Sequence, residues 1–227
     1  IKGEDSMNYI DFVGSTHKST KRNYLERVNE HDKSICAEVA SKFDYEYWDG
    51  ERKYGFGGYR YDGRWKTVAK KYVDYYNIKP GDSVLDIGCG KGFLLYEIYN
   101  LVPNLNVAGI DISNYAVNNA KEEIKEFIKI GSISESLPWN DNSFDFVYSI
   151  NTLHNLYNYE INTAIKEINR VSKNKSHITV ESYRNEKEKV NLMYWQLTCR
   201  AFMTPSEWEW LFNYYSYNGD YGCIYFE

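Results

Sequence analysis

Cysteine is scarce in this sequence and its occurrences lie far apart. The four cysteines among 227 residues form no C-x-x-C pair, and no histidines stand at zinc-ligand spacing. We therefore expect neither disulfides nor a structural metal. The sequence also lacks an apolar run of about 18 residues, and its first ten residues lack the basic start and apolar stretch of a secretory signal. These absences predict a soluble, cytoplasmic protein that does not contact membranes.

An excess of positive charge is absent as well. The formal net charge is −5 and the pI is near 5.5, which argues against nucleic acid as a partner. Hydrophobic residues make up 43% of the chain and aromatic residues 17%, so it can form a sizeable core and is not disordered. Its length predicts one domain with an added N-terminal arm, and leaves monomer and homodimer open.

Arginine is the scarce cation, with 8 residues against 19 lysines, while tyrosine occurs 23 times and asparagine 22 times. Lysine, asparagine, isoleucine and tyrosine have AT-rich codons, so genome bias, as in a bacterium, explains much of this composition. The informative question is where the few arginines lie.

Three segments precede the main pattern. Residues 1–6 come before the first methionine, Met7, so an added segment and native sequence are both open, and we infer nothing from them. Over residues 20–43 the apolar positions recur at helical spacing, which predicts one amphipathic helix. Residues 45–65 interleave aromatic, glycine and arginine residues without a period, and predict an ordered loop with specific contacts.

From residue 66 onward, short apolar runs alternate with helical stretches. The expected strands cover residues 83–87, 106–110, 126–130, 144–150 and 177–183, and the expected helices cover 67–77 and begin near residues 92, 114, 160 and 186. This alternation predicts an α/β fold with a doubly wound, Rossmann-like, mainly parallel sheet. Ligands of such sheets bind outside the carboxyl ends of the strands.

A glycine-rich loop, VLDIGCGKG, ends the first expected strand. Its third glycine is Gly92, whereas position 93 is phenylalanine, so the G-x-G-x-x-G spacing of a dinucleotide site is not met. Asp86 stands just before the loop, where a carboxylate would repel a pyrophosphate and favour a cationic ligand. Asp111 ends the next strand, where it can accept hydrogen bonds from the ribose hydroxyls of a nucleoside.

In this order and at these spacings, the motifs VLDIGCGKG, GIDIS and GSISESLPWNDNSFDFVYSINTLHNL resemble the class I S-adenosylmethionine (SAM)-dependent methyltransferases over residues 66–183. The resemblance implies S-adenosyl-L-methionine as cofactor, S-adenosyl-L-homocysteine as product, and a cofactor domain at 66–227 preceded by an arm and lid at 1–65. It implies the cofactor-binding residues Asp86, Gly88, Cys89, Gly90, Asp111, Ile112, Ser132, Ile133 and Asn151. Many relatives have an acidic residue where this chain has Ser132, so the backbone of Ile133 is the alternative contact for adenine.

Methyl transfer from a sulfonium needs a base only if the acceptor carries a proton that must leave. His154 follows the fourth strand at the ligand-binding edge and is the candidate base, with a helix cap or a pocket-lining residue as the alternative. Glu181, at the end of the fifth strand, is expected to orient the acceptor or to act as a second base.

The loop at 45–65 is expected to close the site. Its residues Tyr54, Tyr59 and Tyr61 would form an aromatic lid, and a hydrophobic plug over the sheet edge is the alternative. Arg64 is expected to bind the carboxylate of SAM. Arg60 in the loop and Arg184 after the fifth strand would bind an anionic acceptor, unless they are solvated surface residues.

The arm and the tail resemble a bacterial subgroup of methyltransferases encoded with capsule and other surface-polysaccharide genes, some of which are thought to serve the O-methyl phosphoramidate decoration. We therefore expect methyl transfer to a small anionic acceptor, with a phosphoramidate or sugar precursor of a surface polysaccharide as the first choice. The alternatives are a protein or RNA methyltransferase and, in another class, a non-catalytic SAM-binding regulator.

The tail is shorter than the family pattern requires. A full class I sheet has a sixth strand and an antiparallel seventh, but only about ten residues follow the helix expected at 205–215. We expect one of these strands to be short, displaced to residues 197–202, or missing.

Overall fold

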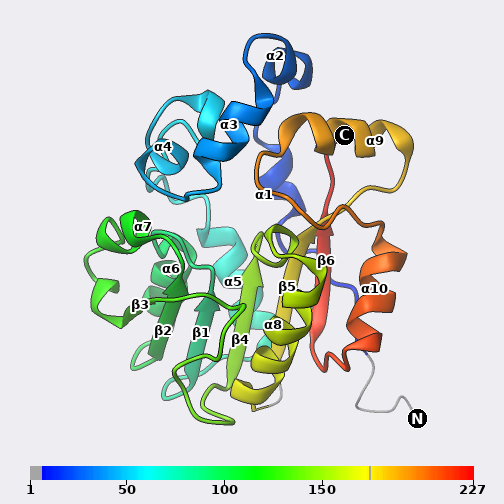
Figure 1. The fold of residues 1–227 in the computed structure, drawn as a ribbon. Helices are drawn as coiled ribbons and strands as arrows, with labels where there is room; N and C mark the ends of the chain where they lie inside the picture. The colour runs from blue at the N-terminus through cyan, green and yellow to red at the C-terminus, as the bar shows by residue number, and fades with distance from the viewer. Residues whose placement is uncertain (1–6, 174) are drawn as a thin grey trace.

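The computed structural model describes residues 7–173 and 175–227, so the question whether residues 1–6 are native lies outside the described part. Its centre is a sheet of six strands in the order β3-β2-β1-β4-β5-β6, with every neighbouring pair parallel (Figure 1). The strands are β1 (Ser83–Ile87), β2 (Asn106–Asp111), β3 (Ile128–Ile130), β4 (Phe146–Ile150), β5 (Ser176–Glu181) and β6 (Asp220–Ile224). The predicted doubly wound sheet is confirmed.

The last strand differs from the expected family pattern. β6 pairs with β5 in parallel, with Asp220 opposite His177, and the described residues 197–202 contain no strand. The described sheet therefore has six strands where the family pattern has seven, which confirms the expectation that one strand is missing. Its last strand is parallel, whereas the last strand of the family pattern is antiparallel. The outer edge of β6 is covered by the N-terminal segment, where Tyr9 forms a parallel bridge with Tyr221 and the Ile10 N–H donates to the Tyr221 carbonyl (2.7 Å).

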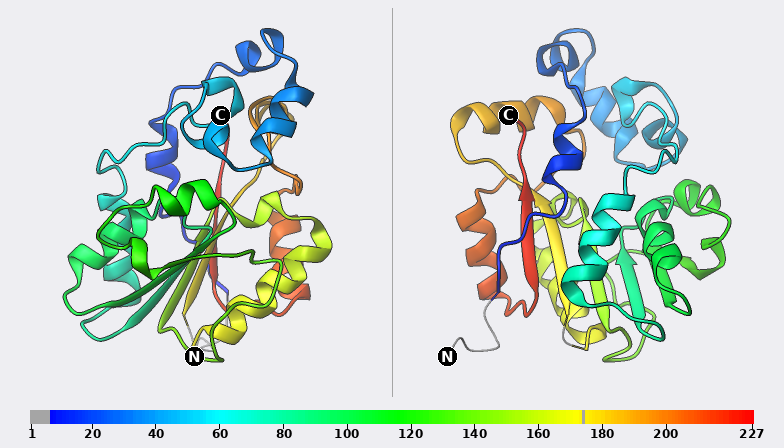
Figure 2. Two further views of the ribbon diagram at one scale, coloured as in Figure 1. Left: turned by 60° about the vertical axis from the view of Figure 1, so that its left-hand side comes forward. Right: turned by 180° about the vertical axis from the view of Figure 1, so that it is seen from behind.

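Helices cover both faces of the sheet, and the residues of its central strands β1, β4 and β5 are nearly all buried. On one face lie α5 (Lys66–Tyr76), α6 (Phe93–Leu101) and α7 (Asn114–Asn118), and on the other α8 (Asn158–Val171) and α10 (Pro205–Tyr214). The left view of Figure 2 shows α8 and α10 on the opposite side of the strands from α5 and α6. No helix in the described part of the chain is long and apolar enough to cross a membrane.

The remaining helices gather at the carboxyl ends of the strands (Figure 1). They are α1 (Gly14–Lys18), α2 (Tyr24–Asn29), α3 (Lys33–Ala40), α4 (Tyr45–Trp48) and α9 (Glu186–Trp195). The chain also has three 3-10 turns: η1 (Arg52–Tyr54) after α4, η2 (Lys125–Phe127) before β3 and η3 (Leu153–Asn155) after β4. The arm therefore lies over the edge of the sheet where ligands bind in doubly wound folds.

The single helix predicted over residues 20–43 is wrong. The chain leaves the helical path after Asn29, and a new helix begins behind Asp32, whose carboxylate accepts hydrogen bonds from the Ser34 and Ile35 N–H groups. This is an N-cap, which helical periodicity does not reveal. Leu25 and Ile35 are both more than half exposed, so the apolar spacing did not mark one buried face.

Candidate active site

The glycine loop has a backbone that only glycine adopts without strain. Gly88 and Gly90 have φ angles of +72° and +54°. A Cβ at Gly88 would lie 1.9 Å from Thr152 Oγ1, so that position has no room for a side chain. The Gly90 N–H donates to Asp111 Oδ2 (2.7 Å), which fixes the loop to the end of β2.

Asp86 lies buried beside this loop, at the end of β1. The Tyr148 hydroxyl donates to its Oδ2 (2.9 Å). Burial raises the pKa of Asp86 to about 8, although the Tyr148 hydrogen bond acts in the opposite direction, and the nearby Asp111 raises it further. A cation placed next to this carboxyl group would therefore be strongly favoured.

Two cavities meet at the glycine loop. One, the inner chamber, lies between the arm and Asp86, and the other, the side pocket, lies along the end of β2. Gly88, Asn151, Tyr47 and Trp48 line both. The two cavities thus form adjoining halves of one site, with the glycine loop between them.

The predicted cofactor residues divide between these halves. Asp86, Cys89, Gly90 and Arg64 line the inner chamber, Asp111, Ile112, Ser132 and Ile133 line the side pocket, and Gly88 and Asn151 line both. The structure therefore places all ten around two adjoining cavities.

Asp111 is held in place before any ligand is considered. Its Oδ1 accepts from the Ser113 N–H (2.8 Å) and its Oδ2 accepts from the Gly90 N–H. Each carboxylate oxygen has a further lone pair, so ribose hydroxyls would bind to an oriented group. In the side pocket, where adenine is expected, the hydroxyl groups of Ser132 and Ser134 form a hydrogen bond (2.8 Å). Ile133 lies in the wall of the same pocket.

The lid is anchored directly onto the glycine loop. A Cβ at Gly90 would lie 2.7 Å from Trp48 Cη2, and the Trp48 Nε1–H donates to Ser113 Oγ (2.9 Å). Beside it, Lys91 and Asp49 form an ion pair of 2.6 Å in which the lysine side chain is 6% exposed. The segment at 45–65 is therefore an ordered cover, as predicted, and it contacts the loop through specific polar bonds.

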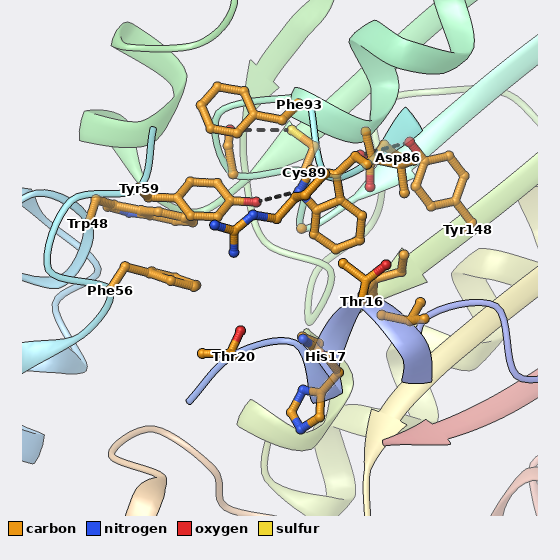
Figure 3. A pocket seen from close by; sticks show the side chains of 18 of the residues that line it. Thr16, His17, Thr20, Trp48, Phe56, Tyr59, Asp86, Cys89, Phe93 and Tyr148 are labelled. Carbon is orange, nitrogen blue, oxygen red and sulfur yellow. Dashed lines mark hydrogen bonds between the residues drawn. The ribbon is translucent and has the colours of Figure 1, made fainter. Parts of the chain in front are cut away.

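Aromatic rings form the wall of the inner chamber. Trp48 stacks on Phe56 (5.3 Å between centroids) and Tyr59 stacks on Phe93 (4.9 Å). Figure 3 shows Trp48, Phe56 and Tyr59 on one side of the pocket and Thr16, His17 and Thr20 of the arm on the other, with Asp86 and Tyr148 beyond them.

A third cavity, the outer chamber, has a volume of about 370 Å³ and shares Thr20, Tyr47, Phe56 and Tyr59 with the inner chamber. Five of the eight arginines of the chain line it: Arg22, Arg27, Arg52, Arg60 and Arg64. Arg22 and Arg64 line both chambers. The scarce arginines are thus concentrated next to the space that faces the glycine loop.

The predicted catalytic pair lies outside these chambers. His154 is 2% exposed, its Nδ1 accepts from the Glu181 N–H (3.2 Å), and burial lowers its pKa to about 3. The prediction that His154 lies in the pocket as a base is therefore corrected: it is a neutral histidine that connects η3 to β5.

Glu181 is equally enclosed. Its Oε1 accepts a hydrogen bond from Gln196, its Oε2 lies 3.2 Å from His154 Nε2 without hydrogen-bond geometry, and burial raises its pKa to about 8. Glu181 lines none of the three chambers described above. The expectation that it orients the acceptor is corrected in the same way.

The predicted substrate residues also divide. Tyr59 and Arg60 line the outer chamber, whereas Tyr54, Tyr61 and Arg184 line none of the three cavities. Tyr61 instead donates to Glu97 Oε1 (2.5 Å), and Arg184 forms ion pairs with Glu188 and Glu227. Substrate contacts are therefore not expected from these three residues.

Sequence reasoning missed the arm residues that complete the chambers. Arg22 and Arg27 lie in the segment predicted as one amphipathic helix, and His17 was given no role, yet all three line the chambers. The rarity of arginine was the signal that could have identified Arg22 and Arg27. Tyr47 and Trp48 lie in the loop at 45–65, where no local pattern distinguishes them from the other aromatic residues.

Comparison with known proteins agrees with this geometry. A family model described as a methyltransferase domain matches residues 78–215, more than half of the chain. The chain belongs to the methyltransferase-domain family.

Curated methyltransferases match the same region. The chain is 30% identical over 162 residues to cycloartenol-C-24-methyltransferase 1 of Oryza sativa subsp. japonica, covering 65% of this chain and 43% of the relative. It is 36% identical over 162 residues to phosphoethanolamine N-methyltransferase of Triticum aestivum, covering 67% of this chain and 29% of that protein. The methyltransferase thus spans less than half the length of these two relatives.

Solved structures agree on the fold. The YcgJ protein of Bacillus subtilis has a TM-score of 0.53 at 21% identity, covering 65% of this chain and 66% of that one. A Haloferax volcanii methyltransferase solved with its activator has a TM-score of 0.52 at 22% identity, covering 68% and 72%. The class I fold implies SAM as the cofactor, and the buried Asp86 beside a glycine loop fits a cationic ligand with an amino group.

Proposed function

We propose that this methyltransferase transfers the methyl group of SAM to a small anionic acceptor held beneath the arm. The observation that carries the proposal is that the arginine-lined outer chamber adjoins the inner chamber that contains Asp86 and the glycine loop. In this arrangement Asp86 receives the amino group of SAM, Gly88 and Gly90 pass beside its methionine part, and Asp111 receives the ribose hydroxyls.

SAM supplies an electrophilic methyl group when it is bound. A lone pair of the acceptor forms the new bond to the methyl carbon while the carbon–sulfur bond breaks, and its electron pair stays on sulfur as S-adenosyl-L-homocysteine. The chain's own contribution is to align the two reactants and to exclude water. The lid rings Trp48, Phe56 and Tyr59 present aromatic faces to this space, which suits a sulfonium.

An oxyanion acceptor agrees with the placement of the titratable groups. His154 and Glu181, the two groups expected to remove a proton, lie outside the inner chamber. His17 lines this chamber, but burial lowers its pKa to about 3, which makes it a weak base. A phosphate-type or carboxylate oxygen that is already ionised needs no such base.

Our first choice of acceptor is a phosphoramidate or sugar precursor of a bacterial surface polysaccharide, since both can present phosphate-type oxygens to the arginines. One relative is named phosphoethanolamine N-methyltransferase, after an acceptor that carries a phosphate group. The sterol named for other relatives carries no charge for five guanidinium groups to bind. The enclosed chambers under an aromatic lid also favour a small acceptor over a protein or an RNA.

Calorimetry with SAM and S-adenosyl-L-homocysteine tests the cofactor site, and transfer of labelled methyl to nucleotide-linked sugars, phosphoramidates and phosphoethanolamine tests the acceptor. We expect both cofactor forms to bind and at least one phosphorus-containing acceptor to be labelled. Failure of both cofactor forms to bind would overturn the whole proposal. Binding without transfer to any acceptor would favour a non-catalytic SAM-binding regulator, whereas labelling of protein or RNA alone would favour those substrates.

A further inference from the structure

The guanidinium groups of the outer chamber largely lack carboxylate partners. Among the described residues, Arg64 pairs with Asp62 (2.6 Å), whereas Arg22, Arg27, Arg52 and Arg60 form no ion pair within 4.0 Å. In a chain with net charge −5, four uncompensated guanidinium groups around one cavity are a strong local departure from the average.

Backbone carbonyls, not carboxylates, hold Arg22, Arg27 and Arg52 in position. Arg27 donates to the carbonyls of Trp195 (3.2 Å) and Arg52 (2.5 Å), and Arg52 donates to those of Gly55 (3.1 Å) and Phe56 (2.8 Å). Carbonyl acceptors fix the direction of a guanidinium group but leave its charge uncompensated. The positive charge therefore remains available to a ligand.

One indole ring lies at the centre of the cluster. The guanidinium carbons of Arg22, Arg27 and Arg52 lie 5.5, 4.8 and 5.0 Å from the ring centroid of Trp195 in α9. Cation–π attraction helps to hold three like charges near one another. The ring thus connects arm residues to a helix that follows the fifth strand.

The arrangement is unfavourable without an anion. Burial, followed by repulsion from Arg52, lowers the pKa of Arg27 to about 10, and burial with repulsion from Arg64 lowers the pKa of Arg52. In addition, the Nε of Arg22 is a buried donor with no hydrogen-bond partner in the described structure. An anion would supply both the missing charge and the missing acceptor.

We propose that the outer chamber is a subsite for a multiply charged phosphate-type group of the acceptor, a phosphate monoester or a diphosphate, bound by Arg22, Arg27, Arg52 and Arg60. This inference rests on the proposed function in so far as the bound group belongs to the methyl acceptor. Several guanidinium forks around one cavity match the oxygens of a tetrahedral dianion, whereas a planar carboxylate carries one charge and two oxygens.

Calorimetric titration with inorganic phosphate, pyrophosphate and acetate, in the presence of saturating S-adenosyl-L-homocysteine, tests the subsite. We expect pyrophosphate or phosphate to bind at least about tenfold more tightly than acetate. The stronger of the two phosphate probes then distinguishes a diphosphate-bearing acceptor from a monoester. Equal affinity for all three anions would overturn the proposal.

Arg52→Gln and Arg27→Gln should each weaken phosphate-probe binding about tenfold or more, because each removes a charged donor. Arg52→Lys, which keeps the charge but loses the fork, should weaken it by a smaller factor. The matched control is Lys166→Gln, which removes one charge from an exposed residue of α8 that lines neither chamber. Equal weakening in this control would mean non-specific attraction and would overturn the subsite.

Binding of S-adenosyl-L-homocysteine, measured in the same variants, separates the two proposals and confirms that each variant is folded. Normal cofactor binding with no phosphate binding in the wild type would reject the subsite and leave the methyltransferase proposal intact. If the wild type does not bind S-adenosyl-L-homocysteine, the proposed function is rejected. Phosphate binding by the same protein would still identify the anion subsite.

Discussion

We expect Asp86 to couple cofactor binding to the release of a proton. Burial raises its pKa to about 8, so in the ligand-free protein near neutral pH this carboxyl group is mostly protonated. An ammonium group bound beside it favours the ionised form. Binding should therefore release a proton at pH values below about 8, and the affinity should rise as the pH rises toward that value.

We predict that S-adenosyl-L-homocysteine binding near pH 7 releases up to about one proton, and that Asp86→Asn removes this release and weakens binding at least about tenfold. Calorimetry in buffers with different ionisation enthalpies measures the released protons. Glu181→Gln is the control, because Glu181 has a similarly raised pKa but lines neither half of the cofactor site. Proton release that persists in Asp86→Asn would contradict the assigned role.

Glu181 has a different consequence, for stability alone. Its pKa is raised from 4.5 to about 8 by burial, so the folded protein keeps this proton to higher pH than the unfolded chain does. Its contribution to stability is complete below about pH 4.5 and is lost as the pH rises through about 8.

We therefore predict that Glu181→Gln raises the free energy of unfolding at pH 9, relative to the wild type, by at least about 1 kcal/mol more than at pH 5. Urea unfolding at both pH values measures the difference. Glu126→Gln, which removes the same charge from an exposed residue of η2, should show no such pH-dependent gain. A parallel pH response of the two variants would argue against a buried, protonated Glu181.

At the scale of elements, the lid is fastened to the cofactor loop by one buried ion pair and its neighbours. Asp49 accepts from Lys91 (2.6 Å) and from the Tyr115 hydroxyl (2.7 Å), so it connects α4 to both the glycine loop and α7. This contact holds the lid segment against the glycine loop that lines the inner chamber.

We predict that Asp49→Asn speeds tryptic cleavage within residues 51–65 about tenfold or more, because the loss leaves the Lys91 charge without its partner. Saturating S-adenosyl-L-homocysteine should slow that cleavage again by ordering the loop under the lid. The control is Asp74→Asn, which breaks the exposed Lys70–Asp74 pair and should change the cleavage rate little. Unchanged cleavage in Asp49→Asn would show that this ion pair does not hold the lid.

The glycine loop and the strands were predictable because local rules determine them. Positive φ angles at Gly88 and Gly90, and the alternation of apolar runs with helices, leave direct traces in sequence. The break at Asp32 depends on a helix cap, and the parallel direction of β6 depends on its pairing with β5. Apolar periodicity encodes neither.

The same distinction applies within the site. Asp86 and Asp111 lie at the carboxyl ends of β1 and β2, so their location at the sheet edge could be predicted from the sequence. His154 follows a strand, but the direction of its side chain depends on the packing of η3 against β5, and the prediction failed. Arg22 and Arg27 reach the outer chamber through the path of the arm, which no local pattern determines.

At the scale of the whole molecule, the division at residue 65 separates segments that share one hydrophobic core. Phe12 of the arm is buried, with its ring centroid 4.7 Å from that of Tyr72 in α5 and 4.9 Å from that of His177 in β5. Together with the bridge between Tyr9 and Tyr221, this packing makes the N-terminal segment part of the sheet's support. Unfolding of the arm should therefore be coupled to unfolding of the sheet.

We predict that Phe12→Ala lowers the free energy of unfolding of the entire chain by about 3–5 kcal/mol, because it removes a buried aromatic ring from the core around β5. Far-UV circular dichroism follows the sheet and its helices, and tryptophan fluorescence includes Trp48 of the arm and Trp208 of α10. Both signals should report one shared transition, at a lower urea concentration than in the wild type. Leu25→Ala, in an exposed part of the same arm, should change stability by less than about 0.5 kcal/mol. A sheet transition that stays at the wild-type midpoint while only the arm's signal shifts would instead establish residues 1–65 as an independently folding unit.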